Sequence, residues 1–112
     1  MVRRTGGYVR PYAATENRKR EMRRFVIERE ISKVGAFTPG QLAGAAKTSN
    51  AALTKLGPGI QWVHSYVTGE QTYCIYLAKN EALIKRHAEI SGFPANRITE
   101  VTAIIDPTTA SN

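Results

Sequence analysis

The sequence predicts an α+β domain in which strands and helices follow the order strand, helix, strand, strand, helix, strand. Runs of β-branched and aromatic residues recur along the chain and indicate strands. Two other segments carry apolar residues at helical spacing behind capping residues. A length of 112 residues with 42% hydrophobic residues suits one domain with one modest core.

The first strand and the first helix are predicted from alternation and from a capping motif. Residues 23–31 alternate in polarity, with Phe25, Ile27 and Ile31 on one face. Thr38 can cap a helix, Pro39 suits its first position, and Gln41 completes a capping box. The helix then presents a narrow stripe that should lie close on a sheet, formed by Leu42, Ala45, Ala46, Ser49, Ala52, Leu53 and Leu56.

A β-hairpin follows the first helix and contains most of the side chains that can do chemistry. Its strands cover about residues 60–67 and 72–78, joined by a tight turn at Gly69-Glu70. Asn80 caps the second helix, and Gly92 is placed to end it.

Residues 97–105 form the last predicted strand, before Asp106-Pro107. With right-handed crossovers, this order gives a ferredoxin-like βαββαβ sandwich, a four-stranded antiparallel sheet with two helices on one face. The other sheet face has no cover, so we expect a homodimer that packs through this open face.

The basic charge is concentrated at the N-terminus. Residues 1–21 hold six Lys or Arg against two Glu, so they carry +4 of a net charge of +7. We expect a flexible arm there, followed by a domain over residues 22–109 and a tail over 110–112. The arm can make weak electrostatic contact with nucleic acid. Whether Met1 or Met22 is the natural start remains open.

Several function classes find no support in the sequence. No apolar run approaches the ~18–20 residues that cross a bilayer, and no apolar segment marks a secretory signal. The single Cys cannot form an intrachain disulfide, so we expect a cytoplasmic protein. Gln71–Tyr76 lacks the basic and small residues of an RNA-recognition motif. Without a nucleophile–base pair or a cofactor motif, the sequence indicates no specific reaction.

Five segments carry a resemblance to a known family. They are Leu56–Thr68, Tyr73–Tyr76, His87-Ala88, Gly92–Ala95 and Ile98–Thr108. Together they resemble the nickel-binding-protein-like family of small bacterial ferredoxin-like domains, over about residues 22–109. The resemblance implies the same fold, dimerisation and nickel binding. The basic arm departs from the family pattern, which often starts near the first strand.

The candidate metal ligands are His64, Cys74 and His87, because imidazole and thiolate both suit nickel or zinc. Glu28 and Glu100 could add oxygen ligands. No C-x-x-C or H-x-x-x-H spacing is present, so the local signal for a metal site is weak. Because a site within one subunit would need extra ligands or water, we expect a surface or interface site and not a closed structural one. A strand cysteine is also commonly an inert small hydrophobe, and a histidine on an apolar helix face is commonly a core residue.

We therefore expect a divalent-metal (nickel) binding protein that sequesters or handles metal. The alternative is a small dimeric enzyme or ligand-binding protein in which His64 lines a cavity on the open sheet face.

The register of the hairpin decides which donors meet. With a two-residue turn, His64 lies on the open face and Cys74 points to the helices, where His87 could approach it. The open face then also carries three aromatic residues, Trp62, Tyr66 and Tyr73. A three-residue turn with a bulge instead brings His64 beside Cys74.

Overall fold

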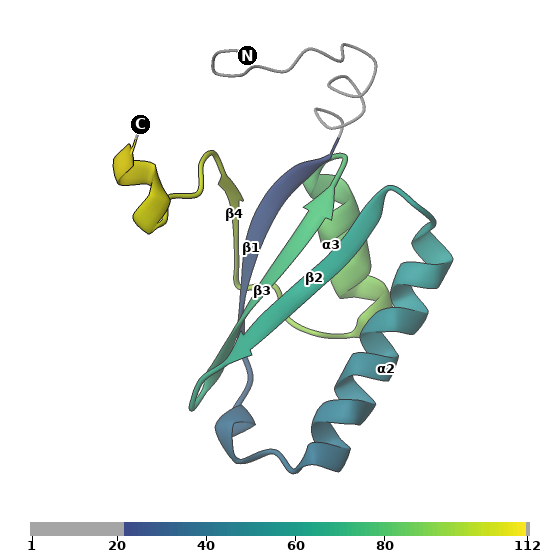
Figure 1. Ribbon diagram of the computed structural model, residues 1–112. Helices are drawn as coiled ribbons and strands as arrows, with labels where there is room; N and C mark the ends of the chain where they lie inside the picture. The colour runs from purple at the N-terminus through teal and green to yellow at the C-terminus, as the bar shows by residue number, and fades with distance from the viewer. Residues whose placement is uncertain (1–21, 112) are drawn as a thin grey trace.

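Four strands form one antiparallel sheet in the order β2-β3-β1-β4, which confirms the ferredoxin-like prediction (Figure 1). The computed structural model describes residues 22–111. The strands are β1 (Arg23–Glu30), β2 (Ile60–Val67), β3 (Gln71–Ala78) and β4 (Arg97–Val101). The helices are α2 (Pro39–Leu56) and α3 (Glu81–Ser91), with short 3-10 turns η1 (Val34–Ala36) and η2 (Pro107–Ser111). The predicted arm, residues 1–21, lies outside the described residues.

Both long helices begin at the predicted caps. Thr38 and Gln41 form a reciprocal capping box at the start of α2, with hydrogen bonds of 2.9 and 3.2 Å. The Asn80 side chain accepts from the Leu83 amide at 3.0 Å and starts α3. Gly92 ends α3 with φ +82°, a conformation that favours glycine. Within residues 22–111, no helix combines the length and apolar character needed to cross a membrane.

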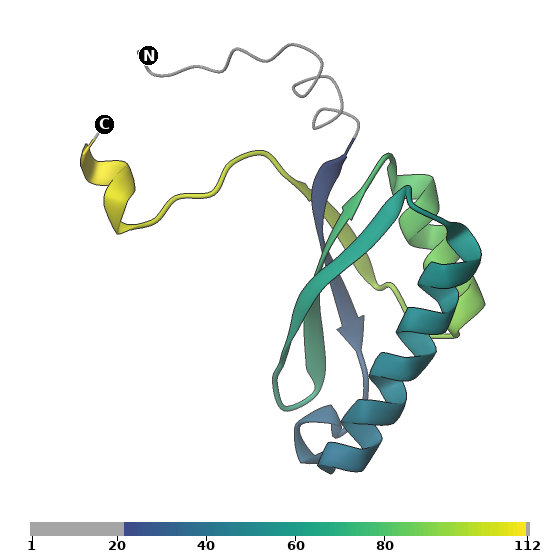
Figure 2. The same ribbon diagram turned by 45° about the vertical axis from the view of Figure 1, so that its right-hand side comes forward.

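The helices cover one face of the sheet and leave the opposite face without a layer among residues 22–111 (Figure 2). The core lies between helices and sheet, and its most deeply buried apolar members include Phe25, Ile27, Ala78 and Ile84. Strand β3 alternates strictly, with buried residues on the helix side and half-buried residues on the open side. The open face therefore keeps apolar side chains partly exposed, among them Val26, Tyr73, Ile75 and Leu77.

The last strand is shorter than the sequence predicts. We expected residues 97–105, but β4 ends at Val101, which pairs with Arg24 near the first residue of β1. β1 itself begins at Arg23, one residue beyond this pair. Ile104 and Ile105 are 66% and 80% exposed, on a segment that runs away from the sheet (Figure 2).

A β-bulge in β2 corrects one prediction about the hairpin. Near the turn the two-residue register holds, because His64 lies opposite Ile75 and Val67 opposite Thr72. Between Trp62 and His64 the register shifts by one residue, so Trp62 lies opposite Tyr76. The prediction that Trp62 shares the open face with His64 is therefore wrong, since the extra residue turns the indole toward the helices.

Candidate functional site

The three predicted metal ligands do not converge. His64 lies exposed on the open face, whereas Cys74 is buried on the helix side, and His87 is completely buried on α3. Within residues 22–111, no group of three or more His, Cys, Asp or Glu side chains is arranged to hold a metal ion. A metal bound at any of these residues would need further ligands from outside one copy of the described domain.

The His64 ring is oriented by a neighbour on the same strand. Its Nε2 lies 3.1 Å from the Tyr66 hydroxyl, and the two rings meet edge to face at 4.9 Å. Tyr66 is itself 59% exposed. This arrangement presents an imidazole to solvent on the apolar open face, and imidazole is a common metal ligand.

The two candidate carboxylates have basic neighbours. Glu28 lies on the open face, 3.9 Å from Arg97 Nε, and accepts a hydrogen bond from Gln71 at 3.2 Å. Glu100 pairs with Arg23 at 3.3 Å, with both side chains more than 40% exposed. Such exposed ion pairs contribute little to stability. Of the two carboxylates, only Glu28 shares its sheet face with His64.

His87 belongs to a buried hydrogen-bonded group that links α3 to α2 and β3. Its Nε2 lies 3.2 Å from Ser49 Oγ and 3.3 Å from the Ser49 carbonyl oxygen, and Ser49 Oγ lies 3.1 Å from the Tyr76 hydroxyl. Because a carbonyl oxygen only accepts, we assign the ring proton to Nε2. Nδ1 is then a bare acceptor, and it is buried without a partner.

Burial changes the pKa of both ring-bearing members of this group. It lowers the pKa of His87, and the nearby charge of Arg29 lowers that pKa further. Burial also raises the pKa of the Tyr76 hydroxyl. Both groups are therefore neutral near pH 7, which suits a hydrogen-bonded interior.

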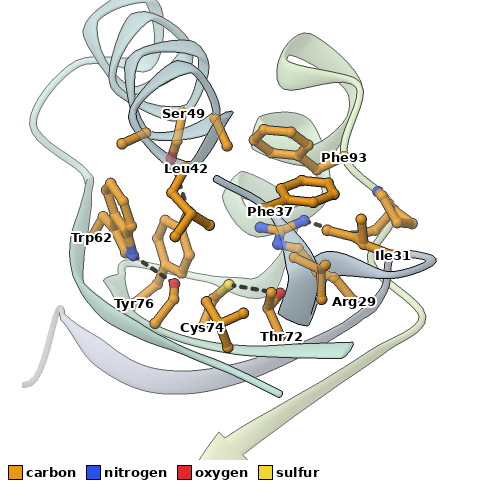
Figure 3. A pocket seen from close by; sticks show the side chains of 16 residues that line it. Arg29, Ile31, Phe37, Leu42, Ser49, Trp62, Thr72, Cys74, Tyr76 and Phe93 are labelled. Carbon is orange, nitrogen blue, oxygen red and sulfur yellow. Dashed lines mark hydrogen bonds between the residues drawn. The ribbon is translucent and has the colours of Figure 1, made fainter. Parts of the chain in front are cut away.

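A cavity of about 390 Å³ lies between α2 and the sheet, next to this group (Figure 3). Its walls are mostly apolar and aromatic, with Trp62 and Tyr76 on one side and Phe37 and Phe93 on another (Figure 3). The Trp62 and Tyr76 rings are stacked, with centroids 6.5 Å apart. Cys74 and Thr72 lie on the sheet side, and the Cys74 sulfur is 3.5 Å from Thr72 Oγ1. The small stripe of α2 predicted from sequence, with Ala45, Ala46 and Ser49, leaves this space open.

This cavity is on the helix side of the sheet, and His64 does not line it. The sequence predicted a cavity lined by His64 on the open face, whereas this cavity lies on the opposite side of the sheet. Sequence reasoning overlooked Arg29, which follows Phe25 and Ile27 on the buried side of β1 and lines the cavity. The signal was present, because period-two alternation puts residue 29 on that same face.

Comparison with known proteins supports the family resemblance. A family model described as "Nickel responsive protein SCO4226-like" matches residues 25–101. The crystal structure of SCO4226 from Streptomyces coelicolor A3(2) has the same fold, with a TM-score of 0.63 and 18% sequence identity. That similarity covers 73% of this chain and 99% of the other. No curated protein matches this chain.

Proposed function

The chain belongs to the SCO4226-like family of nickel-responsive proteins, and from this premise we propose that it binds nickel or a similar divalent metal through His64. The observation that supports this most directly is the exposure of His64. The chain has two histidines, and the other, His87, is sealed in the core. Imidazole is a suitable ligand for nickel, and the Tyr66 hydroxyl orients this one.

A second copy of the chain is the source we propose for further ligands. One imidazole does not complete a coordination sphere, and a symmetric contact between two open faces would supply a second His64. Glu28, on the same face, adds a carboxylate to that interface. The half-buried apolar residues of the open face give such a contact its stability.

The role we propose is metal handling, in which the bound ion is carried or sequestered rather than used in catalysis. Ligands shared between two copies allow metal loading and dimerisation to depend on each other. Through such coupling, the oligomeric state of a small domain can change with nickel concentration without a separate sensor domain.

Calorimetric titration of Ni²⁺ into the full chain tests the proposal, with Zn²⁺ as competitor. We expect micromolar or tighter binding, weakened at least about tenfold by His64→Ala. His87→Gln is the matched control, since it removes the other imidazole and should leave the affinity unchanged. Binding only at millimolar concentrations, or equal binding by the His64→Ala variant with its fold intact, would contradict the assignment.

A further inference from the structure

Arg29 carries a buried charge that the described residues leave uncompensated. Its side chain is 2% exposed, and Nη1 donates to the Pro94 carbonyl oxygen at 2.7 Å. Nη2 is buried with no hydrogen-bond partner. Within residues 22–111, no carboxylate forms an ion pair with Arg29. The carboxylates that are paired have a different arginine or lysine as partner. A buried charge without a counterion is costly, so its presence calls for a partner.

Two aromatic rings lie close to the guanidinium. Its central carbon is 5.9 Å from the Tyr76 ring centroid and 5.8 Å from that of Phe93. These cation–π contacts stabilise the charge in part. They do not supply a hydrogen-bond acceptor for Nη2, and a ring face stabilises a positive charge less than a counterion does.

The cavity beside Arg29 has the size and lining of a small-molecule site. Its volume of about 390 Å³ falls in the range of roughly 300–1,000 Å³ typical of ligand pockets. Among the lining residues in the described part of the chain, 22–111, Arg29 alone carries a full charge and none is a carboxylate. The other polar lining side chains are neutral: Ser49, Ser65, Thr72, Trp62 and Tyr76.

We propose that this cavity binds an apolar monocarboxylate, whose anionic group pairs with Arg29 while its hydrocarbon body lies against Trp62 and Tyr76. The charge of the ligand follows from the single guanidinium. One negative charge neutralises it, whereas a doubly charged phosphate would leave an excess charge among apolar walls. A guanidinium also matches a carboxylate geometrically.

Access to the site is provided by the exposed members of its lining. Leu42 on α2 and Val67 on β2 are 38% and 45% exposed, so the cavity opens to solvent near them. Nη2 itself is buried, so a carboxylate would reach it only after a lining side chain moves aside. The proposal therefore includes a local rearrangement on binding, and it stands independently of the nickel site on the other face.

Trp62, the only tryptophan in the chain, provides the readout for a test. Its emission is followed while decanoate, or decan-1-ol with the same hydrocarbon body, is added to the full chain. We expect saturable binding of decanoate, weakened at least about tenfold by Arg29→Met, while binding of decan-1-ol changes little. Arg86→Met, which removes an exposed arginine on α3, is the charge-matched control and should bind decanoate normally.

Ala46→Phe is a second variant that keeps Arg29 but fills the cavity from α2. It should weaken the binding of decanoate and of decan-1-ol alike. Equal effects of Arg29→Met on both ligands, or no response of Trp62 to decanoate up to roughly 1 mM, would overturn the proposal.

Discussion

Trp62 and Tyr76 face each other across β2 and β3, with ring centroids 6.5 Å apart and planes inclined by 19°. Their stacking depends on the bulge between Trp62 and His64, which adds one residue to β2. In a regular strand without a bulge, residues 62 and 64 would share a face, and the indole would lie on the same side of the sheet as His64. The one-residue bulge thus places the exposed His64 and the cavity-lining Trp62 on opposite faces of the sheet.

Deletion of Val63 should leave this arrangement intact. Trp62 would still lie opposite Tyr76 and His64 opposite Ile75, in a regular ladder. We expect the free energy of unfolding to change by no more than about 1 kcal/mol. Urea unfolding followed by Trp62 emission measures it.

Deletion of Ser65 is the matched control, because it also removes the bulge. It turns His64 inward opposite Cys74 and removes the hydrogen bond that Trp62 donates to Ser65 at 2.9 Å. We expect a loss of about 1–3 kcal/mol. Equal stabilities for the two deletions would contradict this account of the register.

Replacing Arg29 with Met should stabilise the fold. The substitution removes a buried charge that has no carboxylate partner within residues 22–111, and it keeps a long side chain in the same space. We expect a gain of about 1 kcal/mol in the free energy of unfolding, measured in urea. Arg29→Ala, which removes the charge but enlarges the cavity, should be less stable than Arg29→Met. A clear loss of stability in the Met variant would show that the charge supports the fold.

His87 makes stability depend on pH in a defined direction. Its pKa is lowered in the folded state, so the unfolded chain binds a proton first as the pH falls below about 6.5. Stability from this group is complete above that pH, and it decreases as the pH falls toward the folded-state pKa. Thermal unfolding at pH values from roughly 5 to 7.5, a range that brackets the ordinary imidazole pKa, measures how stability depends on pH.

The matched pair for the pH measurement is His87→Gln and His64→Gln. The first should flatten the dependence in this range, and the second should retain it because it leaves His87 in place. If His64→Gln flattened the curve instead, the effect would belong to the open face.

The proposed dimer predicts a strong effect of charge at the centre of the open face. Val26 lies there between Ile75 on β3 and Thr99 on β4. Val26→Lys should convert the dimer into a monomer, since a buried ammonium without a partner is costly. Light scattering measures the change in mass. Ala43→Lys adds the same charge on the exposed side of α2 and should leave the mass unchanged. A monomeric wild-type chain would refute the dimer.

Gly35 is required by a close approach of two backbones. A Cβ at this position would lie 2.8 Å from both the Gly69 Cα and the Thr68 carbonyl oxygen, and its amide donates to Gly69 at 3.0 Å. Gly35→Ala should therefore cost about 1–3 kcal/mol in thermal or urea unfolding. Gly44→Ala is the control within α2, where open space and helix propensity predict a gain of about 1 kcal/mol. Similar effects of both substitutions would contradict the close approach.

Local patterns were sufficient to predict the fold but not the site. Thr38, Asn80 and Gly92 act through neighbours a few residues away, so their roles are visible in the sequence. The bulge at Val63 depends on how Trp62 packs against Tyr76, fourteen residues along the chain, and no local signal marks it. The cavity likewise results from the spacing between α2 and the sheet, which only tertiary packing determines.

The candidate metal ligands show the same division. Chemistry identified His64, Cys74 and His87 as possible donors, but sheet register and helix docking place them in three different environments. Arg29 was hidden because a charged residue on an apolar face reads as an interruption of the pattern. Alternation places it on the buried face of β1, but its position against the rings of Tyr76 and Phe93 depends on tertiary packing.

Burial of strand β3 on both of its sides should limit how fast its sequence changes in evolution. None of its eight residues is exposed, since one side faces the helices and cavity and the other faces the open sheet surface. Random sequence change will therefore be accepted least often in this strand, and more often on α2, where most residues are exposed. Among diverging relatives, β3 should change slowly and in concert with the residues that it touches on both sides.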